Sequence, residues 1–224
     1  NKMGIPQLVI GNKNYSSWSL RAWLILAKLG IEFQEIRIPL CREGYQAEIR
    51  RYSPAGKVPV YLEDDLTIWD SLAIAEYFAE QHPELLPNDT KQRALARSLA
   101  AEMHSSFFAL RSQMPMNCRA TNRKVELTSE LADDLKRIQA IWTSCRNQNT
   151  QTGSWLFGNF TIVDAMYAPV VFRFNTYDVE CEPIVTDYIS WVLNDPDIKR
   201  WDEAAKNETE IIQTEEVGVI AVQN

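Results

Sequence analysis

The sequence contains few residues of the kinds that build metal centres and covalent frameworks. It has only two histidines, His82 and His104, which are too few and too far apart for a typical zinc site. Its four cysteines are widely and irregularly spaced and include no C-x-x-C pair. This spacing favours buried structural thiols over a disulfide framework, a redox pair or a zinc pair. We therefore expect a protein that binds no metal.

Positive charge and long apolar runs are also scarce. The 23 Lys and Arg residues are outnumbered by 30 Asp and Glu residues, and the net charge of -7 argues against a nucleic acid partner, whose phosphates require clustered cations. No apolar run approaches the ~20 residues that span a bilayer. The polar start Asn1-Lys2-Met3-Gly4 does not resemble a signal peptide. We expect a soluble cytoplasmic protein that contacts neither nucleic acid nor membrane.

Residues 1–82 carry signals for both strands and helices. A serine-rich segment at Ser16 opens a long helical pattern that Gly30 closes. Two apolar runs at 60–63 and 66–69 flank a short acidic turn and predict a hairpin. The other expected elements are strands at 8–11 and 33–38 and helices at 45–52 and from Asp70 onward. This order of elements predicts an α/β domain.

Strand signals disappear from Lys91 onward. Apolar residues recur at steps of three to four from Leu95 to Met114 and from Leu127 to Trp142, which predicts two amphipathic helices. Further helices are expected at 162–177, 183–194 and 197–207. We therefore expect an α/β domain at 1–82, a linker at 83–90 and an all-helical domain at 91–224.

A proline interrupts the third strand pattern at Val58-Pro59. Proline removes a ladder donor, so this position favours a cis bond or an edge strand, and a cis bond would leave the main chain of Val58 free for an extended peptide. Asp70 and Ser71 then begin a helix, and we expect its uncapped first turn to present free N–H groups to an anion. One short segment thus predicts a peptide-pairing edge beside a carboxylate site.

A second helix start is marked by Thr161 and Asp164. Their spacing is that of a capping box, and Phe160 stands where a hydrophobic staple would lie. We interpret this motif as local folding, with a loss of ~1 kcal/mol expected on removal of the cap. Asp164 is therefore expected to matter for stability more than for chemistry.

The ordered motifs resemble those of the cytosolic glutathione transferase superfamily. The segment Ser16-Ser17-Trp18-Ser19-Leu20-Arg21 resembles its serine-type branch and is nearest to the zeta class, although Trp18 stands where the zeta pattern has cysteine. The resemblance implies a thioredoxin-like N-terminal domain, an all-α C-terminal domain, glutathione as co-substrate and a homodimer. It also implies that the cysteinyl main chain of glutathione pairs with Val58 beside Pro59.

The same resemblance implies a glutamyl subsite at the helix start. Asp70 would meet the glutamyl ammonium and Ser71 its carboxylate, with Lys57 helping through its charge. Family members need a thiolate, and lowering a thiol pKa by roughly two units takes about 2.7 kcal/mol. A hydroxyl donor to the sulfur supplies ~1.5 to 3 kcal/mol of this. Counting back from Gly30, Ser16 falls on the zeta-type catalytic serine, with Ser17 second.

Other donors and other uses of these serines stay open at this point. Tyr15 is a weaker rival because it lies off the position that tyrosine takes in other classes. Ser19 is expected to cap or line the helix, and the whole cluster can also be read as N-terminal capping, which serine favours.

The electrophile site is expected between the two domains. We predict that Phe107, Phe108 and Arg111 contribute to it, and the resemblance to the zeta class adds Arg173, which lies about one turn before the position of the zeta arginine. The segment 209–224 is expected either to pack over this site or to be a poorly ordered tail.

The resulting prediction is a glutathione transferase that directs a glutathione thiolate at an electrophilic small molecule. Two alternatives are a non-catalytic glutathione-binding or scaffolding protein with the same fold and a zeta-like glutathione-dependent isomerase. A cysteine-based thiol transferase is disfavoured because no cysteine stands at the start of the first helix.

Overall fold

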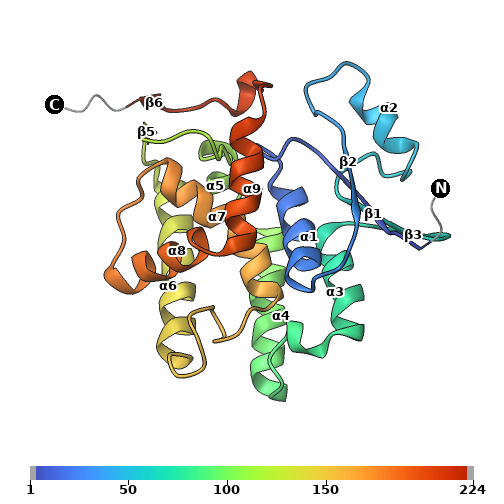
Figure 1. Ribbon diagram of the computed structural model, residues 1–224. Helices are drawn as coiled ribbons and strands as arrows, with labels where there is room; N and C mark the ends of the chain where they lie inside the picture. The colour runs from blue at the N-terminus through green and yellow to red at the C-terminus, as the bar shows by residue number, and fades with distance from the viewer. Residues whose placement is uncertain (1–3, 221–224) are drawn as a thin grey trace.

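A four-stranded mixed sheet forms the first part of the protein, as a computed structural model that describes residues 4–220 shows (Figure 1). Its strands are β1 (Gln7–Ile10), β2 (Gln34–Arg37), β3 (Val60–Glu63) and β4 (Leu66–Trp69). The order is β2-β1-β3-β4, with β2 parallel to β1 and the other neighbours antiparallel. The hairpin of β3 and β4 has the predicted bounds.

Helices cover both faces of this sheet. They are α1 (Ser17–Lys28), α2 (Tyr45–Arg50) and α3 (Ser71–Gln81). Ile49 of α2 packs with Val9 and Val60 in a small cluster, whereas Leu8 and Tyr61 point into the large core that α1 and α3 share. The alternation of side chains along β1 and β3 therefore places α2 on one face and α1 with α3 on the other.

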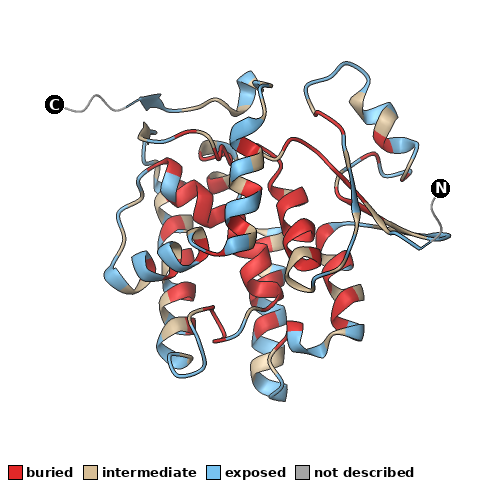
Figure 2. Ribbon diagram, in the orientation of Figure 1, coloured by how far each residue is buried: buried red, intermediate tan, exposed pale blue. Residues whose placement is uncertain are grey.

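The second part is helical, as predicted, except for one short strand pair that the all-helical prediction did not include. It comprises a 3-10 turn η1 (Pro83–Leu85), α4 (Thr90–Ser105), α5 (Phe108–Gln113), α6 (Ser129–Gln148), α7 (Ile162–Thr176), α8 (Pro183–Leu193), α9 (Pro196–Asn207), η2 (Gln213–Glu215) and a small β5 (Arg123–Lys124) and β6 (Val219–Ile220) pair. The central helix α7 is buried along almost its whole length (Figure 2). Because α1 packs against α7, the sheet and the helices share one core. The expected division at residues 82 and 91 stays a prediction.

The predicted continuous helix from Leu95 to Met114 is wrong. The chain leaves the helix after Ser105, and Phe107 takes a left-handed conformation with φ 64° before α5 begins. Two contacts from elsewhere fix this break: the main-chain N–H of Leu110 donates to Asp134 (3.1 Å), and the guanidinium of Arg111 donates to the carbonyl of Met103. Each of the two predicted apolar stripes also begins with a residue that lies outside the core, since Leu95 and Leu127 are 38% and 62% exposed.

The capping box at the start of α7 is present as predicted. The Thr161 hydroxyl accepts from the N–H of Val163, and the Asp164 carboxylate accepts from the N–H of Thr161 (3.0 Å). Asp164 also accepts from the N–H of Leu156 (3.0 Å) and from the hydroxyl of Tyr188 (2.8 Å). Burial raises the pKa of Asp164 to about 6.

The cysteines are free and differ in burial. Cys118 and Cys145 are buried and Cys181 is partly buried, but Cys41 is exposed, so the expectation of buried thiols is wrong for that residue. Among residues 4–220, no three His, Cys, Asp or Glu side chains are placed to hold a metal ion. No helix in the same range is both long and apolar enough to cross a membrane.

Candidate functional site

A cavity of about 260 Å³ opens at the start of α1, where the sheet meets the helical part. Its walls come from the first helix, from the loop before β3, from α5 and α7, and from the segment after α9. The lining residues are Tyr15, Ser16, Ser17, Trp18, Arg21, Leu40, Val58, Arg111, Pro115, Met116, Arg173 and Glu215. Two serine hydroxyls, Val58 and three arginines therefore border the same space.

Ser16 is the N-cap of α1. Its hydroxyl oxygen accepts from the N–H of Ser19 (3.4 Å) and shares a hydrogen bond with the Ser19 hydroxyl (2.7 Å). Ser19 in turn accepts from the N–H of Gly11 (3.0 Å). Ser17 is the first helical residue, and its hydroxyl has no hydrogen-bond partner within the described part of the chain. Both hydroxyls are nearly buried at the edge of the cavity.

The phenol of Tyr15 is engaged elsewhere. It donates to the carboxylate of Glu216 (2.6 Å) and accepts from Arg119 (3.1 Å). Burial and the bond to Glu216 raise the pKa of Tyr15 above its usual value. A phenol that already gives its proton to a carboxylate is a poor donor to a sulfur anion.

The peptide bond between Val58 and Pro59 is cis. Val58 lines the cavity, and its main-chain N–H and C=O form no hydrogen bond with residues 4–220. Pro59 is buried, whereas Lys57 is exposed and forms no ion pair within the same range. The main chain at Val58 is therefore available to a ligand, and Lys57 lies outside the cavity wall.

The first turn of α3 is capped, contrary to the expectation of an uncapped start. Asp70 adopts φ 78° and accepts from the N–H of Ala73 (3.1 Å), which satisfies one of the free donors of the first turn. Nε2 of His104 lies 2.9 Å from the other carboxylate oxygen of Asp70. Ser71 is 2% exposed, and its hydroxyl has no partner within residues 4–220. Asp70 and Ser71 do not line the cavity itself.

Three arginines supply positive charge to the cavity. Arg21 and Arg173 are almost completely buried, and Arg111 is partly buried. Nε of Arg21 donates to the carbonyl of Met166 (2.8 Å), but five guanidinium nitrogens of the three residues have no partner within the described part of the chain. Such buried donors are costly to leave unpaired, so their presence points to an anionic ligand.

The arginines also repel one another. Burial, together with the charges of Arg173 and Arg111, lowers the pKa of Arg21 well below its usual value. Burial and Arg111 lower the pKa of Arg173 to about 10. The indole of Trp18 lies between two of them, with the guanidinium carbons of Arg21 and Arg111 at 4.5 and 4.8 Å from its ring centre. The indole faces hold both cations in the cavity wall through cation–π contacts.

The residues predicted for the electrophile site divide into two groups. Arg111 and Arg173 line the cavity, but Phe107 lies in the core and Phe108 is 72% exposed. Both phenylalanines are displaced because the chain turns at Phe107 instead of continuing as a helix. Arg21 was not predicted for this site, although it follows Ser17 by four residues and so shares its helix face.

Known proteins resemble the chain in both sequence and fold. A model of the family described as "Glutathione S-transferase, N-terminal domain" matches residues 15–81. A probable maleylacetoacetate isomerase from Caenorhabditis elegans is 25% identical over 174 residues, covering 76% of this chain and 80% of that protein. The maleylacetoacetate isomerase of Rattus norvegicus is 26% identical over 190 residues, covering 82% of this chain and 84% of that protein.

A solved structure shows the same fold. A glutathione transferase homolog from Burkholderia, crystallised with bound glutathione, superposes with a TM-score of 0.69 at 22% identity and covers 91% of this chain and 100% of that one. At this identity the likeness speaks for the fold alone. Together with the family match over residues 15–81 and the similarity to zeta-type relatives, this shared fold supports a place for the chain near the zeta class of the glutathione transferase superfamily.

Proposed function

We propose that the protein binds glutathione beside the cavity at the start of α1, stabilises its thiolate, and directs it at an electrophile that carries negative charge. The observation that carries the proposal is that one cavity joins two serine hydroxyls, Val58 and three incompletely paired guanidinium groups. The nucleophile and an anionic substrate can therefore meet in one space.

Glutathione would lie along the sheet edge towards α3. Its cysteinyl main chain pairs with the free N–H and C=O of Val58, next to Pro59. Its glutamyl ammonium meets Asp70, and its glutamyl carboxylate meets Ser71, whose buried hydroxyl has no partner in residues 4–220 and needs one. Lys57 adds positive charge near the same ligand.

Ser16 is the proposed donor to the sulfur. If the Ser19 hydroxyl donates to Ser16, the proton of Ser16 is free for the thiolate, and the chain from Gly11 through Ser19 strengthens that donor cooperatively. A hydrogen bond to a charged acceptor contributes ~1.5 to 3 kcal/mol, and the N-terminus of α1 adds ~0.3 to 1 kcal/mol. Ser17, whose hydroxyl is unengaged, is the second candidate.

The second substrate is expected to carry one or two carboxylates. A carboxylate accepts two parallel N–H bonds from a guanidinium and would satisfy donors that Arg21, Arg111 and Arg173 leave unpaired. We propose a small-molecule electrophile of this kind in place of an uncharged apolar one.

The arginines also favour a second candidate, the glutathione-dependent isomerase named in the relatives. Maleylacetoacetate carries two carboxylates, which the arginine-lined cavity would suit. In such a reaction the thiolate adds to a carbon–carbon double bond conjugated to a carbonyl, the new single bond rotates, and the thiolate leaves again. No glutathione is consumed, so product analysis separates isomerisation from conjugation.

We further propose a homodimer in the cytoplasm, as the resemblance to the superfamily implies. Light scattering of the purified chain tests the oligomeric state: a mass near twice 25.8 kDa supports it, and a mass near 25.8 kDa contradicts it.

The test of the function begins with binding. Glutathione at millimolar concentration should raise the melting temperature, because a ligand that binds only the folded state stabilises it. Arg173→Gln should then raise KM roughly ten- to a hundredfold for a carboxylate-bearing electrophile, as expected for loss of ~1.5 to 3 kcal/mol, and leave a neutral electrophile unaffected. The exposed Arg200 provides the control Arg200→Gln. No thermal shift with glutathione would contradict the proposal, and binding without turnover would favour the scaffolding alternative.

A further inference from the structure

The segment after α9 returns to the start of α1 and packs against the loop that precedes Ser16 (Figure 1). We name as the C-terminal clamp the residues Glu208, Glu210 and Glu216 together with Arg119. Every member of the clamp contacts residues 12–15 or another part of the clamp. A cavity wall that belongs to the first helix is thus held by three glutamates close to the other end of the chain and by Arg119.

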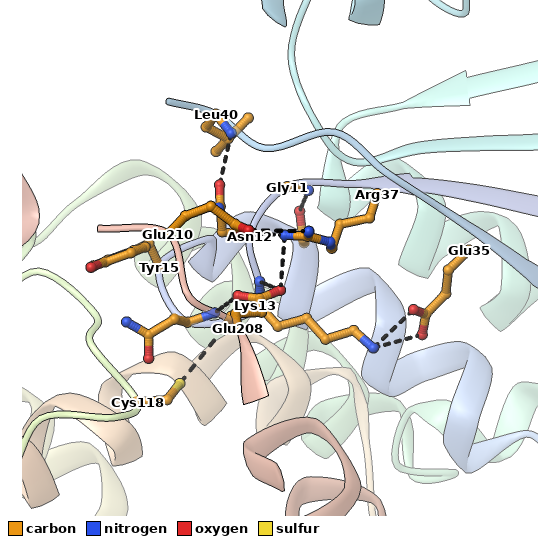
Figure 3. Close-up of polar contacts among 12 residues, drawn as sticks. Gly11, Asn12, Lys13, Tyr15, Glu35, Arg37, Leu40, Cys118, Glu208 and Glu210 are labelled. Atoms are coloured by element: carbon orange, nitrogen blue, oxygen red, sulfur yellow. Dashed lines mark hydrogen bonds and ion pairs between the residues drawn. The ribbon is translucent and has the colours of Figure 1, made fainter. Parts of the chain in front are cut away.

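Glu208 makes the most direct contact with this loop. Its carboxylate oxygens accept from the main-chain N–H of Lys13 (2.9 Å) and of Asn14 (3.0 Å), as Figure 3 shows for the first of these. The side chain of Glu208 is only 7% exposed, and Arg37 lies 3.4 Å from it. A buried carboxylate that accepts two successive main-chain donors fixes the position and the direction of the loop.

The other clamp residues hold the same loop from its sides. Glu210 accepts from the amide of Asn12 (2.9 Å) and pairs with Arg37 (2.5 Å). Arg119 donates to the carbonyls of Glu208 and Glu210, which ties the clamp to the helical part. Figure 3 shows Glu208 and Glu210 beside Asn12, Lys13 and Arg37.

The loop of residues 12–15, which the clamp contacts, determines the positions of Ser16 and Ser17. The N–H of Ser16 donates to the carbonyl of Asn12 (2.8 Å), and the N–H of Ser17 donates to the carbonyl of Tyr15 (3.0 Å). A shift of the loop would therefore move the Ser16 hydroxyl away from the sulfur that it is proposed to face. Misplacement by ~1 Å of a group that acts on the reacting atoms can cost roughly a hundredfold in rate.

We propose that Glu208 is a positioning residue for the thiolate donor, acting through the main chain of Lys13 and Asn14 on Ser16. This inference rests on the proposed function, since it presumes a glutathione thiolate beside Ser16. Glutathione itself is held by Val58, Asp70 and Ser71, so the effect of Glu208 should fall on the acidity and reactivity of the bound thiol and spare its affinity.

The test is Glu208→Gln in the full chain, because glutamine keeps the shape of the side chain but places an amide NH2 group, which cannot accept a hydrogen bond, against one of the two main-chain N–H donors. We expect the pKa of the bound thiol to rise by about one unit. This pKa is read from the pH profile of kcat/KM for the electrophile at saturating glutathione. At neutral pH kcat should fall roughly ten- to a hundredfold, with KM for glutathione within about twofold. Glu203→Gln, at an exposed residue of α9, is the matched control and should change nothing.

Arg119→Lys is the second variant, in case Glu208→Gln does not fold. Lysine keeps the charge but cannot donate to both carbonyls as the planar guanidinium does. The variant should therefore also raise the pKa of the bound thiol, by a smaller amount than Glu208→Gln. A folded variant with an unchanged pH profile and kcat, whatever its melting temperature, overturns the inference. If Ser16→Ala impairs the enzyme while neither clamp variant does, this inference alone fails. If the unaltered protein does not bind glutathione, the proposed function fails with it.

Discussion

Nε2 of His104 lies 2.9 Å from Oδ1 of Asp70, so a helix of the second part reaches the first turn of α3. The other oxygen of Asp70 accepts from Ala73, which leaves the carboxylate fixed from two sides. The ring of His104 also meets the edge of Trp18, with ring centres 5.4 Å apart. The proposed glutamyl subsite and the arginine-lined cavity are thus connected by direct contacts through His104 and Trp18.

His104→Ala is expected to weaken glutathione binding roughly three- to tenfold, about the loss of one hydrogen bond that orients Asp70. The effect should vanish for a glutathione analogue that lacks the α-amino group, because that analogue offers no ammonium to Asp70. Calorimetric titration with both ligands measures the difference. His82→Ala, at a partly exposed histidine beside Glu84, is the control. Equal losses for both ligands would show that His104 acts on the fold alone.

Trp18→Leu is expected to raise KM for a carboxylate-bearing electrophile roughly fivefold or more. The indole contributes two cation–π contacts, each worth ~0.5 to 2 kcal/mol, that hold Arg21 and Arg111 in the cavity wall. Trp18→Phe keeps an aromatic face, so its KM for the same electrophile should lie between those of the unaltered protein and of Trp18→Leu. Steady-state kinetics with a neutral electrophile provide the comparison, and a similar loss for charged and neutral substrates would refute this role of the indole.

Local signals in the sequence predicted much of the fold. The β3–β4 hairpin and the start of α7 follow from the alternation of apolar residues and from the Thr161 and Asp164 cap, which act within a few residues. The break at Phe107 could not be predicted, because it depends on contacts between different elements. Asp134 of α6 accepts from the N–H of Leu110, and Arg111 donates to the carbonyl of Met103 in α4. Helix periodicity continues through such a break and therefore concealed it.

The candidate site was predictable to a similar extent. Recognisable motifs in the sequence include Ser16, Ser17 and Val58, and these three residues border one cavity. Glu208 could not be assigned a role from the sequence, because its partner Lys13 is 195 positions away and a lone glutamate carries no motif. The pairing of His104 with Asp70 was missed for the same reason.

Asp164→Asn is expected to destabilise the protein more at pH 4.5 than at pH 7. The pKa of Asp164 is raised to about 6 in the folded state, above its usual value of 3.8, so the folded state binds the proton more tightly than the unfolded chain does. The stability that this proton contributes is fully present below the unfolded pKa and is lost as the pH rises through the folded pKa of about 6. Over that window roughly 3 kcal/mol of stability depends on this proton.

Urea unfolding of both proteins at several pH values measures this dependence. The cost of the substitution at pH 7 should be about 2 kcal/mol, since the carboxylate holds two main-chain donors and Tyr188. A cost that does not change between pH 4.5 and pH 7 would show that Asp164 does not carry the proton.

The central claim is that a serine hydroxyl at the start of α1 stabilises the glutathione thiolate. Titration of the ultraviolet absorbance of the thiolate in the complex, for the unaltered protein, Ser16→Ala and Ser17→Ala, tests it most directly. The bound thiol in the unaltered protein should ionise roughly two pH units below the ~8.5 of a free thiol. Ser16→Ala should return the pKa most of the way to that value while glutathione still binds. A bound thiol that titrates alike in all three proteins would contradict the account.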